Sequence, residues 1–452
     1  MHPRLLRLPL GGGFDPGAVF AALFADRDDV FWLDSGAAGM SYLGAGDRVE
    51  VNAETVWDVL RTVPHSGRGA DPVGDPDAPA FRLGLVGWLG YELRAQTTGA
   101  IVSRPSRYPD AAFLRVGRTI AIDGATGQAE LLALGSSWTG ELGRWRDRVL
   151  RLAGAPAPVP APALARPPAR PSASWHESDA EYLGNIEACQ EAIREGEAYQ
   201  LCLTSEAEVA GRFDPLEVYL RLRSASPSHH AGLIRIGGVS LLSASPERFL
   251  DIDPDGLVRT RPIKGTRPRA NDPATDRRLA AELLASEKER AENLMIVDLM
   301  RNDLARVCEL GSVTVTELLE VESYAHVHQL VSTVTGRLAA GRSAVDAIET
   351  CFPAGSMTGA PKLRATQVLD GLERRARGLY AGCFGYLGRD GRVDLAMTIR
   401  SIVLDERGAT IGAGGGITAL SVPIEELAEA KLKAAALLAA LGAADPGTRL
   451  AV

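Results

Sequence analysis

The chain has 452 residues, of which 46% are apolar and 23% are charged, and its formal net charge is −8. This composition is that of a globular protein, and the length allows one large α/β domain or two to three smaller ones. The negative charge excludes the basic footprint of a nucleic-acid-binding protein. The five cysteines are odd in number and widely spaced, which argues against a disulfide framework.

Neither end of the chain resembles a targeting or membrane segment. Residues 1–10 contain arginines but no apolar run long enough for a signal peptide. The longest weakly polar run, residues 434–444, is far shorter than the ~20 residues that a membrane helix needs. We therefore expect a cytoplasmic protein with no membrane or nucleic-acid partner.

The N-terminal part, residues 1–153, mixes short apolar runs with glycine-rich turns. The runs at 30–33, 83–88 and 119–122 predict strands, and the glycines before Tyr91 suggest close backbone approach. Residues 154–173 are almost entirely Ala and Pro with arginines, a composition that is stiff and unable to pack a core. This segment is either a linker between domains or a long surface excursion within one fold.

The C-terminal part, residues 174–445, alternates predicted helices and strands. A capping box at 178–181 begins a helix that Gly196 ends, and a long helical stretch covers 276–308. Pro423 is a good first-turn residue for a last helix that ends near Gly442. The predicted strands are 201–204, 240–242, 313–315, 331–334, 395–404 and 410–411.

Residues 261–269, RPIKGTRPR, place one lysine between two prolines and among three arginines. A lysine is a nucleophile only in its neutral form, which neighbouring cations and burial both favour. The segment therefore predicts a rigid cationic turn that holds Lys264 as an amine nucleophile. The alternative is an ordinary surface lysine.

Two pairs of glutamates are spaced three apart on predicted helices: Glu289 with Glu292, and Glu426 with Glu429. Residues at this spacing share a helix face. Each pair alone is typical of a solvated acidic surface. If the two helices face each other, the four carboxylates form a cage suited to Mg²⁺, which also needs water and an anionic ligand.

Three further features point to an anionic ligand or to proton transfer. Gly414–Gly416 follow a predicted strand, and their amides could bind an anion, although a flexible turn is the alternative. Arg400 ends an apolar strand and needs either a substrate carboxylate or a structural ion pair. Glu247 lies in a predicted turn shortly before the lysine segment, where it is either a general acid or an exposed carboxylate.

Taken together these stretches resemble the chorismate-utilising enzyme family, which includes anthranilate, aminodeoxychorismate, isochorismate and salicylate synthases. The matching runs follow the family's order through the C-terminal part. They are SPERF (245–249), RPIKGTRPR (261–269), AENLMIVDLMRND (291–303), FPAGSMTGAPK (352–362), GLYAGCFGYLG (378–388), MTIRS (397–401), GAGGGI (412–417) and E-x-x-x-K-A (429–434). The N-terminal part matches less sharply, through LDS (33–35) and GLVGWLGYE (84–92).

The resemblance implies an α+β fold of two large packed, mostly antiparallel β-sheets with helices outside, and an active site in which Mg²⁺ bridges glutamates and chorismate. By position, Glu292 and Glu429 correspond to the metal ligands and Glu289 and Glu426 to supporting carboxylates. The substrate-binding positions are Gln200, Thr266, Ser356, Tyr380, Arg400, Gly414, Gly416 and Lys433. Lys264 and Glu247 take the catalytic positions, and the N-terminal part corresponds to a region that can hold a tryptophan-like ligand.

Two positions discriminate within the family, and a third departs from its pattern. Gln200 stands where water-using members carry a lysine, which favours ammonia as the nucleophile. Lys264 stands where anthranilate synthases usually carry alanine, so the chain is most similar to the aminodeoxychorismate synthase component I branch. Gln329 replaces a histidine that many members carry, with His328 beside it, and this further disfavours pyruvate elimination.

The resemblance thus predicts amination of chorismate for the p-aminobenzoate and folate pathway or for a specialised metabolite. The sequence shows no glutaminase signature, so a separate glutamine amidotransferase subunit is expected to supply ammonia. The alternatives are an anthranilate or aminodeoxyisochorismate synthase and, more distantly, a non-catalytic chorismate-binding protein.

Overall fold

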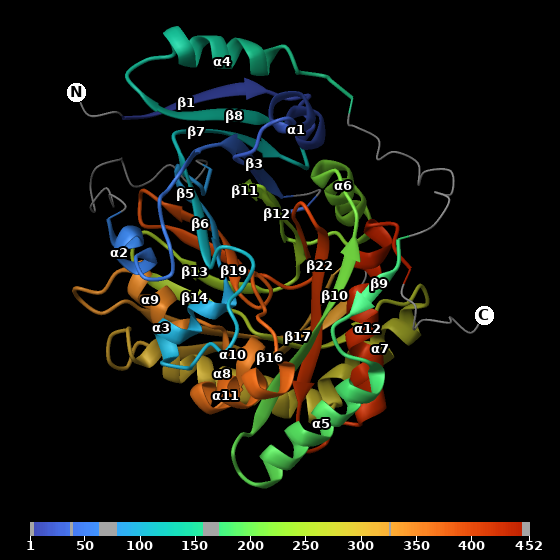
Figure 1. The fold of residues 1–452 in the computed structure, drawn as a ribbon. Helices are drawn as coiled ribbons and strands as arrows, with labels where there is room; N and C mark the ends of the chain where they lie inside the picture. The colour runs from blue at the N-terminus through green and yellow to red at the C-terminus, as the bar shows by residue number, and fades with distance from the viewer. Residues whose placement is uncertain (1–3, 37–38, 63–78, 157–170, 325–326, 445–452) are drawn as a thin grey trace.

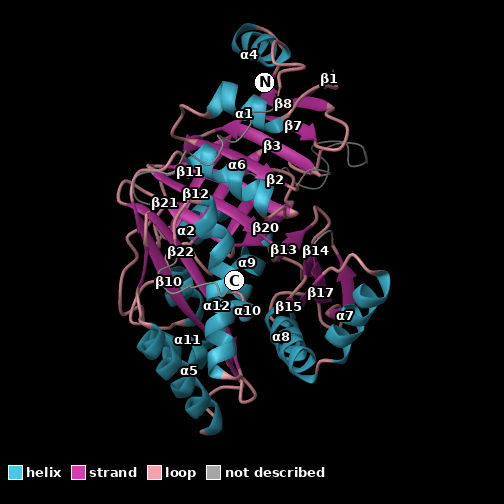
Figure 2. Cartoon of the chain, turned by 90° about the vertical axis from the view of Figure 1, so that its right-hand side faces the viewer, coloured by secondary structure: helices cyan, strands magenta, loops and turns pink. Residues whose placement is uncertain are grey.

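The computed structural model describes residues 4–36, 39–62, 79–156, 171–324 and 327–444. Two large β-sheets pack against each other, and helices cover their outer faces (Figure 1). A view turned by 90° shows the same layers from the side (Figure 2). Neighbouring strands of both sheets run antiparallel. The predicted fold class is confirmed.

The larger sheet has 12 described strands. In spatial order they are β1 (Arg4–Gly11), β8 (Ala129–Gly135), β7 (Arg118–Asp123), β3 (Met40–Ala45), β2 (Val30–Asp34), β11 (His230–Ile236), β12 (Val239–Ser245), β21 (Ser401–Leu404), β22 (Gly408–Ile417), β10 (Gln200–Ala210) and β18 (Gly359–Ala360), with β9 (Ala173–Trp175) also paired to β10.

The second sheet has 10 described strands. Their order is β15 (Ile263–Pro268), β17 (Val327–Arg337), β14 (Leu257–Thr260), β13 (Arg248–Ile252), β20 (Val393–Met397), β19 (Cys383–Gly388), β5 (Gly84–Leu89), β6 (Ala111–Val116) and β4 (Asp47–Arg48), and β16 (Thr314–Ser323) also pairs with β17.

Alternate residues of each strand face opposite sides, so one apolar strand serves two cores. Phe31 of β2 packs with Trp88 of β5 and Phe384 of β19 in the core between the sheets. Trp32, the next residue of β2, packs on the outer side with Phe20.

The described helices are α1 (Pro16–Phe24), α2 (Val56–Arg61), α3 (Arg94–Thr98), α4 (Gly140–Leu150), α5 (Asp179–Arg194), α6 (Pro215–Ala225), α7 (Pro273–Ala285), α8 (Glu287–Ala305), α9 (Ala344–Cys351), α10 (Gly355–Thr358), α11 (Lys362–Glu373), α12 (Pro423–Ala440) and the 3₁₀ turn η1 (Tyr91–Leu93).

In each sheet a block of strands from the N-terminal part of the chain is joined to a block from the C-terminal part. β2 pairs with β11 in the larger sheet, and β5 pairs with β19 in the other. A Cβ on Gly87 of β5 would lie 2.0 Å from the Ala112 carbonyl oxygen, so the close approach expected of these glycines is confirmed. The boundaries at 153 and 174 stay a prediction, and residues 157–170 of the expected linker lie outside the described residues.

Two predicted elements are each divided in the structure. The helical stretch 276–308 is two helices, because the Ser286 side chain accepts a hydrogen bond from Glu289 N and begins α8. The strand 395–404 is interrupted at Arg400, whose φ is +50° between β20 and β21. Residues other than glycine rarely adopt a positive φ, so an arginine in an apolar strand gives no sign that the strand breaks there.

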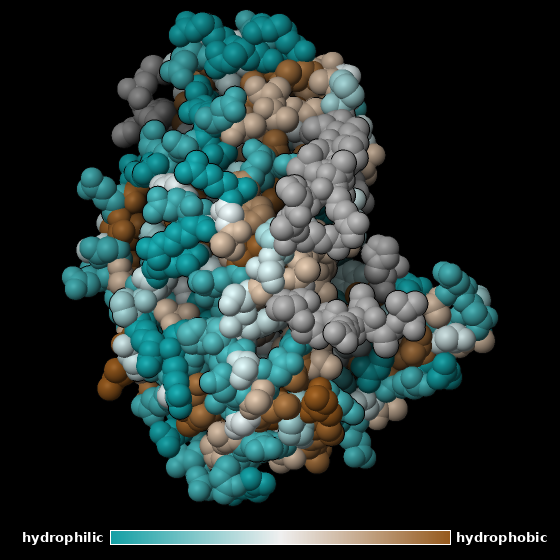
Figure 3. All heavy atoms as spheres, turned by 45° about the vertical axis from the view of Figure 1, so that its right-hand side comes forward, coloured by the Kyte–Doolittle hydropathy of each residue, from teal (hydrophilic) through white to brown (hydrophobic). Residues whose placement is uncertain are grey.

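Other local predictions are confirmed. Ser178 and Glu181 form the capping box of α5, and Pro423 opens α12. The five cysteines are buried and carry no disulfide. In the described part of the chain, no helix is both long and apolar enough to span a bilayer. Exposed apolar side chains are scattered among hydrophilic ones on the face in Figure 3, as is usual for protein surfaces.

Candidate active site

A cavity of about 580 Å³ lies among β15, β22, α8, α10 and α12. A cavity of about 530 Å³ lies elsewhere, so volume alone does not select the site. A third cavity, of about 460 Å³, adjoins the first one and shares Pro246, Thr266, Val327, Gln329, Arg400 and Lys433 with it. The side chains select the first cavity, because every predicted site residue except Gln200 lines it. These residues are Glu247, Lys264, Thr266, Glu289, Glu292, Ser356, Tyr380, Arg400, Gly414, Gly416, Glu426, Glu429 and Lys433.

Lys264 lies in strand β15, so the prediction of a cationic turn is wrong. The pairing register with β17 shifts between Ile263 and Thr266, and Gly265 has a φ of +83°. A Cβ at Gly265 would lie 2.9 Å from Glu289 Oε2, so a glycine is required there. The irregular strand places Lys264 in the cavity wall, where Nζ donates to the Ser356 carbonyl oxygen at 3.5 Å.

The arginines beside Lys264 in sequence have their own carboxylate partners. Arg261 pairs with Glu322, and Arg269 pairs with Asp276 at 2.9 Å. The expectation that these cations lower the lysine pKa is therefore wrong. Burial does disfavour the charged amine, but the nearby carboxylates, Glu292 first, outweigh it and raise the pKa of Lys264 above its ordinary value.

Glu247 occupies the corner between β12 and β13, as the predicted turn requires, and it is buried rather than exposed. Burial raises the pKa of its carboxyl group, while the positive charge of Lys264 acts in the opposite direction. A carboxylic acid with a raised pKa is better suited than an ordinary one to protonate a leaving group.

Glu292 of α8 and Glu429 of α12 face the same cavity in different electrostatic states. Burial raises the pKa of Glu292 to about 7, against the opposing effect of Lys264. Burial also raises the pKa of Glu429, but the ion pair with Lys433 at 2.7 Å outweighs it, so that pKa lies below its ordinary value. These two carboxylates from facing helices are donors of the kind that Mg²⁺ accepts.

The two supporting glutamates are already paired with cations. Glu289 lies 3.6 Å from Arg267, and Glu426 accepts hydrogen bonds of 2.7 Å from both Lys288 and Ser421. Among the described residues, no group of three or more His, Cys, Asp or Glu side chains is arranged to hold a metal ion. The donor set therefore fits Mg²⁺ only with water and substrate oxygens completing its coordination.

The Arg400 side chain lines the cavity. The described residues offer its guanidinium no hydrogen bond or ion pair, and its side chain is exposed to the cavity. Its backbone oxygen accepts a hydrogen bond from Ala244 N at 3.1 Å, which holds the left-handed turn. An unpaired guanidinium held in this way can bind a carboxylate through two hydrogen bonds.

Gly412 and Gly414–Gly416 lie within strand β22, so the prediction that Gly414–Gly416 follow a strand is wrong, and so is the alternative of a flexible turn. Because glycine has no side chain, these positions leave room for neighbouring side chains. A Cβ on Gly412 would lie 2.1 Å from Tyr380 Cγ, and one on Gly416 would lie 2.1 Å from Gln200 Nε2. Gln200 is buried behind this strand, and its Oε1 has no hydrogen-bond partner. It is the predicted residue that does not line the cavity itself.

Gln329 and His328 point to different sides of β17. Gln329 lines the cavity, as expected of the position that carries histidine in many relatives. His328 is buried between Asp276 and Ser323, at 2.9 and 2.8 Å from its ring nitrogens. The neighbouring histidine therefore does not substitute for the missing one.

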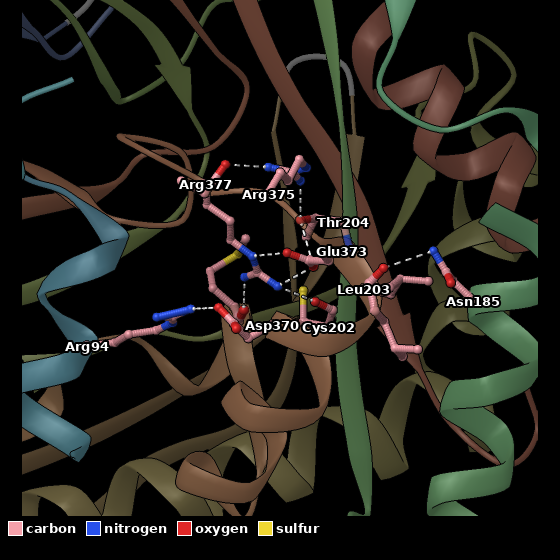
Figure 4. Close-up of polar contacts among 12 residues, drawn as sticks. Arg94, Asn185, Cys202, Leu203, Thr204, Asp370, Glu373, Arg375 and Arg377 are labelled. Carbon is pink, nitrogen blue, oxygen red and sulfur yellow. Dashed lines mark hydrogen bonds and ion pairs between the residues drawn. The ribbon is translucent and has the colours of Figure 1, made fainter. Parts of the chain in front are cut away.

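Several site residues were missed by the sequence reasoning. Cys202 and Met357 line the cavity beside Lys264, and Lys288 pairs with Glu426 at its rim. Behind the wall, Arg377 and Glu373 form a fully buried ion pair of 2.6 Å (Figure 4). Lys288 lies four residues before Glu292, and Arg377 lies four residues after Glu373, so this spacing was a readable signal for both pairs. Nothing in the sequence indicates the hydrogen bonds of Arg377 to Met357 and Cys202.

Comparison with known proteins agrees with this geometry. Residues 21–439, nearly the whole chain, match the family described as "chorismate binding enzyme". The chain belongs to the chorismate-binding enzyme family. The match covers both the N-terminal and the C-terminal part of the chain, and each part contributes strands to both sheets.

Relatives of this chorismate-binding enzyme include two kinds of synthase. It is 43% identical to the aminodeoxychorismate synthase of Streptomyces pristinaespiralis over 96% of this chain and 64% of that protein. A second aminodeoxychorismate synthase, from Streptomyces griseus, is 40% identical over 98% of this chain and 66% of its own length. The chain thus spans slightly less than two thirds of these two relatives.

Anthranilate synthases are also similar. The component 1 protein of Streptomyces coelicolor is 37% identical over 96% of this chain and 88% of that protein. The crystal structure of anthranilate synthase component I from Streptococcus pneumoniae superposes with a TM-score of 0.72, at 28% identity, over 96% of this chain and 92% of that one.

Proposed function

We propose that this chorismate-binding enzyme aminates chorismate to 4-amino-4-deoxychorismate, as an aminodeoxychorismate synthase component I. The observation that carries the proposal is the position of Lys264, whose side chain lines the same cavity as the carboxylates of Glu247 and Glu292. Relatives with the same named activity, at 43% and 40% identity, support it.

The proposed chemistry has two displacements on the chorismate ring. Neutral Lys264 forms a bond to C2 while Glu247 gives its proton to the C4 hydroxyl, which leaves as water as both conjugated ring double bonds shift. Ammonia then bonds to C4, both double bonds shift back, and the C2–nitrogen bond breaks to release the lysine as a neutral amine. Covalent catalysis of this kind divides one difficult substitution into two easier ones.

Glu292 and Glu429 would hold Mg²⁺, which supplies charge neutralisation and a binding point for a substrate carboxylate. Arg400 and Tyr380 would bind the second carboxylate from the opposite wall of the cavity. Once their charge is neutralised, the glutamates would no longer raise the pKa of Lys264. The lysine could then lose its proton, as it must before its amine can attack.

We further propose a glutamine amidotransferase partner and a cytoplasmic location. Ammonium, the dominant form at neutral pH, is not a nucleophile, so an enzyme of this kind needs ammonia delivered to the cavity. The prediction is that purified protein accepts ammonium salts at raised pH and does not use glutamine alone.

Anthranilate synthesis is the second candidate, favoured by the 37% identical component 1 protein. It differs in eliminating pyruvate from the aminated ring. Incubation of the protein with chorismate, Mg²⁺ and isotopically labelled ammonium, followed by mass spectrometry, separates the two. Labelled 4-amino-4-deoxychorismate supports the proposal, labelled anthranilate as the main product overturns it, and binding without turnover would indicate a non-catalytic chorismate-binding protein.

A further inference from the structure

A buried ion pair stands directly behind the cavity wall that carries the Lys264 amine. Arg377 donates from Nε and Nη2 to the two oxygens of Glu373, at 2.8 and 2.6 Å (Figure 4). Both side chains are almost completely buried, at 2% and 3% exposure, and neither lines the cavity. They cannot touch a substrate, so any effect on the reaction passes through other groups.

The remaining guanidinium hydrogens are directed at the backbone of the wall. Nη1 donates to the Met357 carbonyl oxygen at 2.7 Å, and Nη2 donates to the Cys202 carbonyl oxygen at 2.8 Å. Met357 belongs to the one-turn helix α10 and Cys202 to β10, and both residues line the cavity. One planar group thus fixes two wall segments that are far apart in sequence.

The carbonyl held by Arg377 is next to the one that holds the lysine. Ser356 precedes Met357 in α10, and its oxygen accepts the hydrogen bond from Lys264 Nζ. Because α10 is a single turn, with few internal hydrogen bonds, its orientation depends on such outside contacts. Tyr380, another residue of the wall, donates from its backbone N to the Arg377 oxygen at 3.2 Å.

Residues from the N-terminal part lock Arg377 in place from the other side. The Glu92 carboxylate accepts hydrogen bonds of 2.9 Å from the backbone N atoms of Arg377 and Gly378. The Tyr91 ring lies 4.3 Å from the guanidinium carbon. Glu373 also accepts from Thr204 N and Oγ1, both at 2.9 Å, which ties it to β10.

We infer that Arg377, oriented by Glu373, is a positioning residue that sets the place of the Lys264 amine through the carbonyls of α10 and β10. The inference depends on the proposed function only where its test measures turnover. The geometric relation between Arg377 and the lysine holds whichever reaction the cavity catalyses.

The test compares Arg377→Lys with Arg94→Lys. Arg94 is a matched control. It is 3% exposed, lies 5.1 Å from the same Tyr91 ring and pairs with Asp370, but among the described residues it has no hydrogen bond to one that lines the cavity. A lysine at position 377 keeps the positive charge. Its single nitrogen cannot reach both backbone carbonyls and the Glu373 carboxylate as the guanidinium does. Thermal unfolding and near-ultraviolet circular dichroism report the structural loss in each variant.

The first readout needs no turnover. Acetylation of Lys264 by N-hydroxysuccinimidyl acetate is followed by mass spectrometry and normalised to Lys431 of the same chain. We expect Arg377→Lys to raise the Lys264 rate about threefold or more, since the amine loses its fixed acceptor, while Arg94→Lys leaves it unchanged. Equal rates in the two variants would overturn the inference, even if the protein proves to make another product.

The second readout is the split between kcat and KM. A displaced amine should lower kcat by about 10- to 100-fold and change the KM for chorismate by less than about threefold, because Arg400 is untouched. A kcat loss equal to that of Arg94→Lys would contradict the inference. Should Arg377→Lys not fold, Glu373→Asp keeps the charge and displaces the guanidinium by about one methylene, and the same two readouts apply with the same expected directions.

Discussion

Lys288 Nζ lies 2.7 Å from Glu426 Oε1 and thereby joins helix α8 to helix α12. The same amine lies 3.9 Å from Glu292 Oε1, so one cation is shared between a supporting carboxylate and an expected metal ligand. The pairing links the N-terminal turns of the two helices, and Glu292 and Glu429 line the same cavity. Glu426 thus forms a salt bridge between the helices and is not a free carboxylate available to a metal ion.

Replacing Glu429 with Gln should weaken the dependence of activity on Mg²⁺. The amide keeps the shape of the side chain and removes the negative charge, so we expect the Mg²⁺ concentration for half-maximal rate to rise at least roughly tenfold. The matched control is Glu425→Gln, an exposed carboxylate of the same helix that does not line the cavity. An unchanged Mg²⁺ titration would refute the ligand role of Glu429.

Replacing Lys264 with Met should abolish both the covalent adduct and turnover. Met keeps the length of the side chain without an amine, and loss of a nucleophile typically costs roughly 10³-fold or more in rate. Mass spectrometry of protein quenched during turnover reports the adduct. Lys431→Met is the control, because that lysine pairs with Asp179 on α5 instead. An adduct that persists without Lys264 would place the nucleophile elsewhere.

Arg400→Gln should weaken chorismate binding. The guanidinium has no partner among the described side chains, so its hydrogen bonds are available to the substrate. Loss of a charge-assisted pair should raise the Kd by roughly 100-fold, about 2.7 kcal/mol, as measured by calorimetry without ammonium. The exposed Arg407 provides the control substitution. Equal affinity in Arg400→Gln and wild type would assign the carboxylate contact to another residue.

The stability of the fold should decrease as pH rises between about 4.5 and about 7 because of Glu92. Burial raises the pKa of Glu92 to about 7, above its ordinary 4.5, so the folded state binds this proton more tightly than the unfolded state. The free energy of unfolding is therefore highest below the unfolded pKa and falls by up to about 3 kcal/mol as pH passes the folded one.

The check on Glu92 is the difference between wild type and Glu92→Gln. The variant lacks the titrating group, so its thermal midpoint should change less than that of wild type between about pH 5 and about pH 7.5. Glu54→Gln, an exposed carboxylate, serves as the control. Parallel pH profiles for wild type and Glu92→Gln would show that the carboxyl group has an ordinary pKa.

Gly412→Ala should destabilise the protein, and Gly371→Ala should not. A Cβ at Gly412 would overlap the Tyr380 ring, so we expect a loss of about 1–3 kcal/mol together with weaker substrate binding. Gly371 lies in α11 with open space around it, and alanine there should add about 0.5–1 kcal/mol of stability. Denaturant unfolding measures both, and a neutral Gly412→Ala would mean that the ring has room to move.

Most elements of the fold could be predicted from their own residues. The capping box of α5, the first-turn proline of α12 and the apolar strands follow local rules, and the structure confirms them. The breaks at Ser286 and Arg400 could not be predicted, because a serine is tolerated within a helix and an arginine with φ of +50° gives no sequence signal. The order of strands in the sheets depends on contacts between distant segments.

The sequence by itself determined which residues form the candidate site, since the family motifs carry Lys264, Glu292, Arg400 and Glu429 in order, and the cavity contains all four. The tertiary structure decided their electrostatic states. A pKa depends on charges within a few ångströms in space, so distant Glu292 raises the pKa of Lys264 while its sequence neighbour Arg261 is paired elsewhere. Apart from its neighbour Glu373, the partners of buried Arg377 are visible only in three dimensions for the same reason: Met357, Cys202 and Glu92 come from three separate segments of the chain.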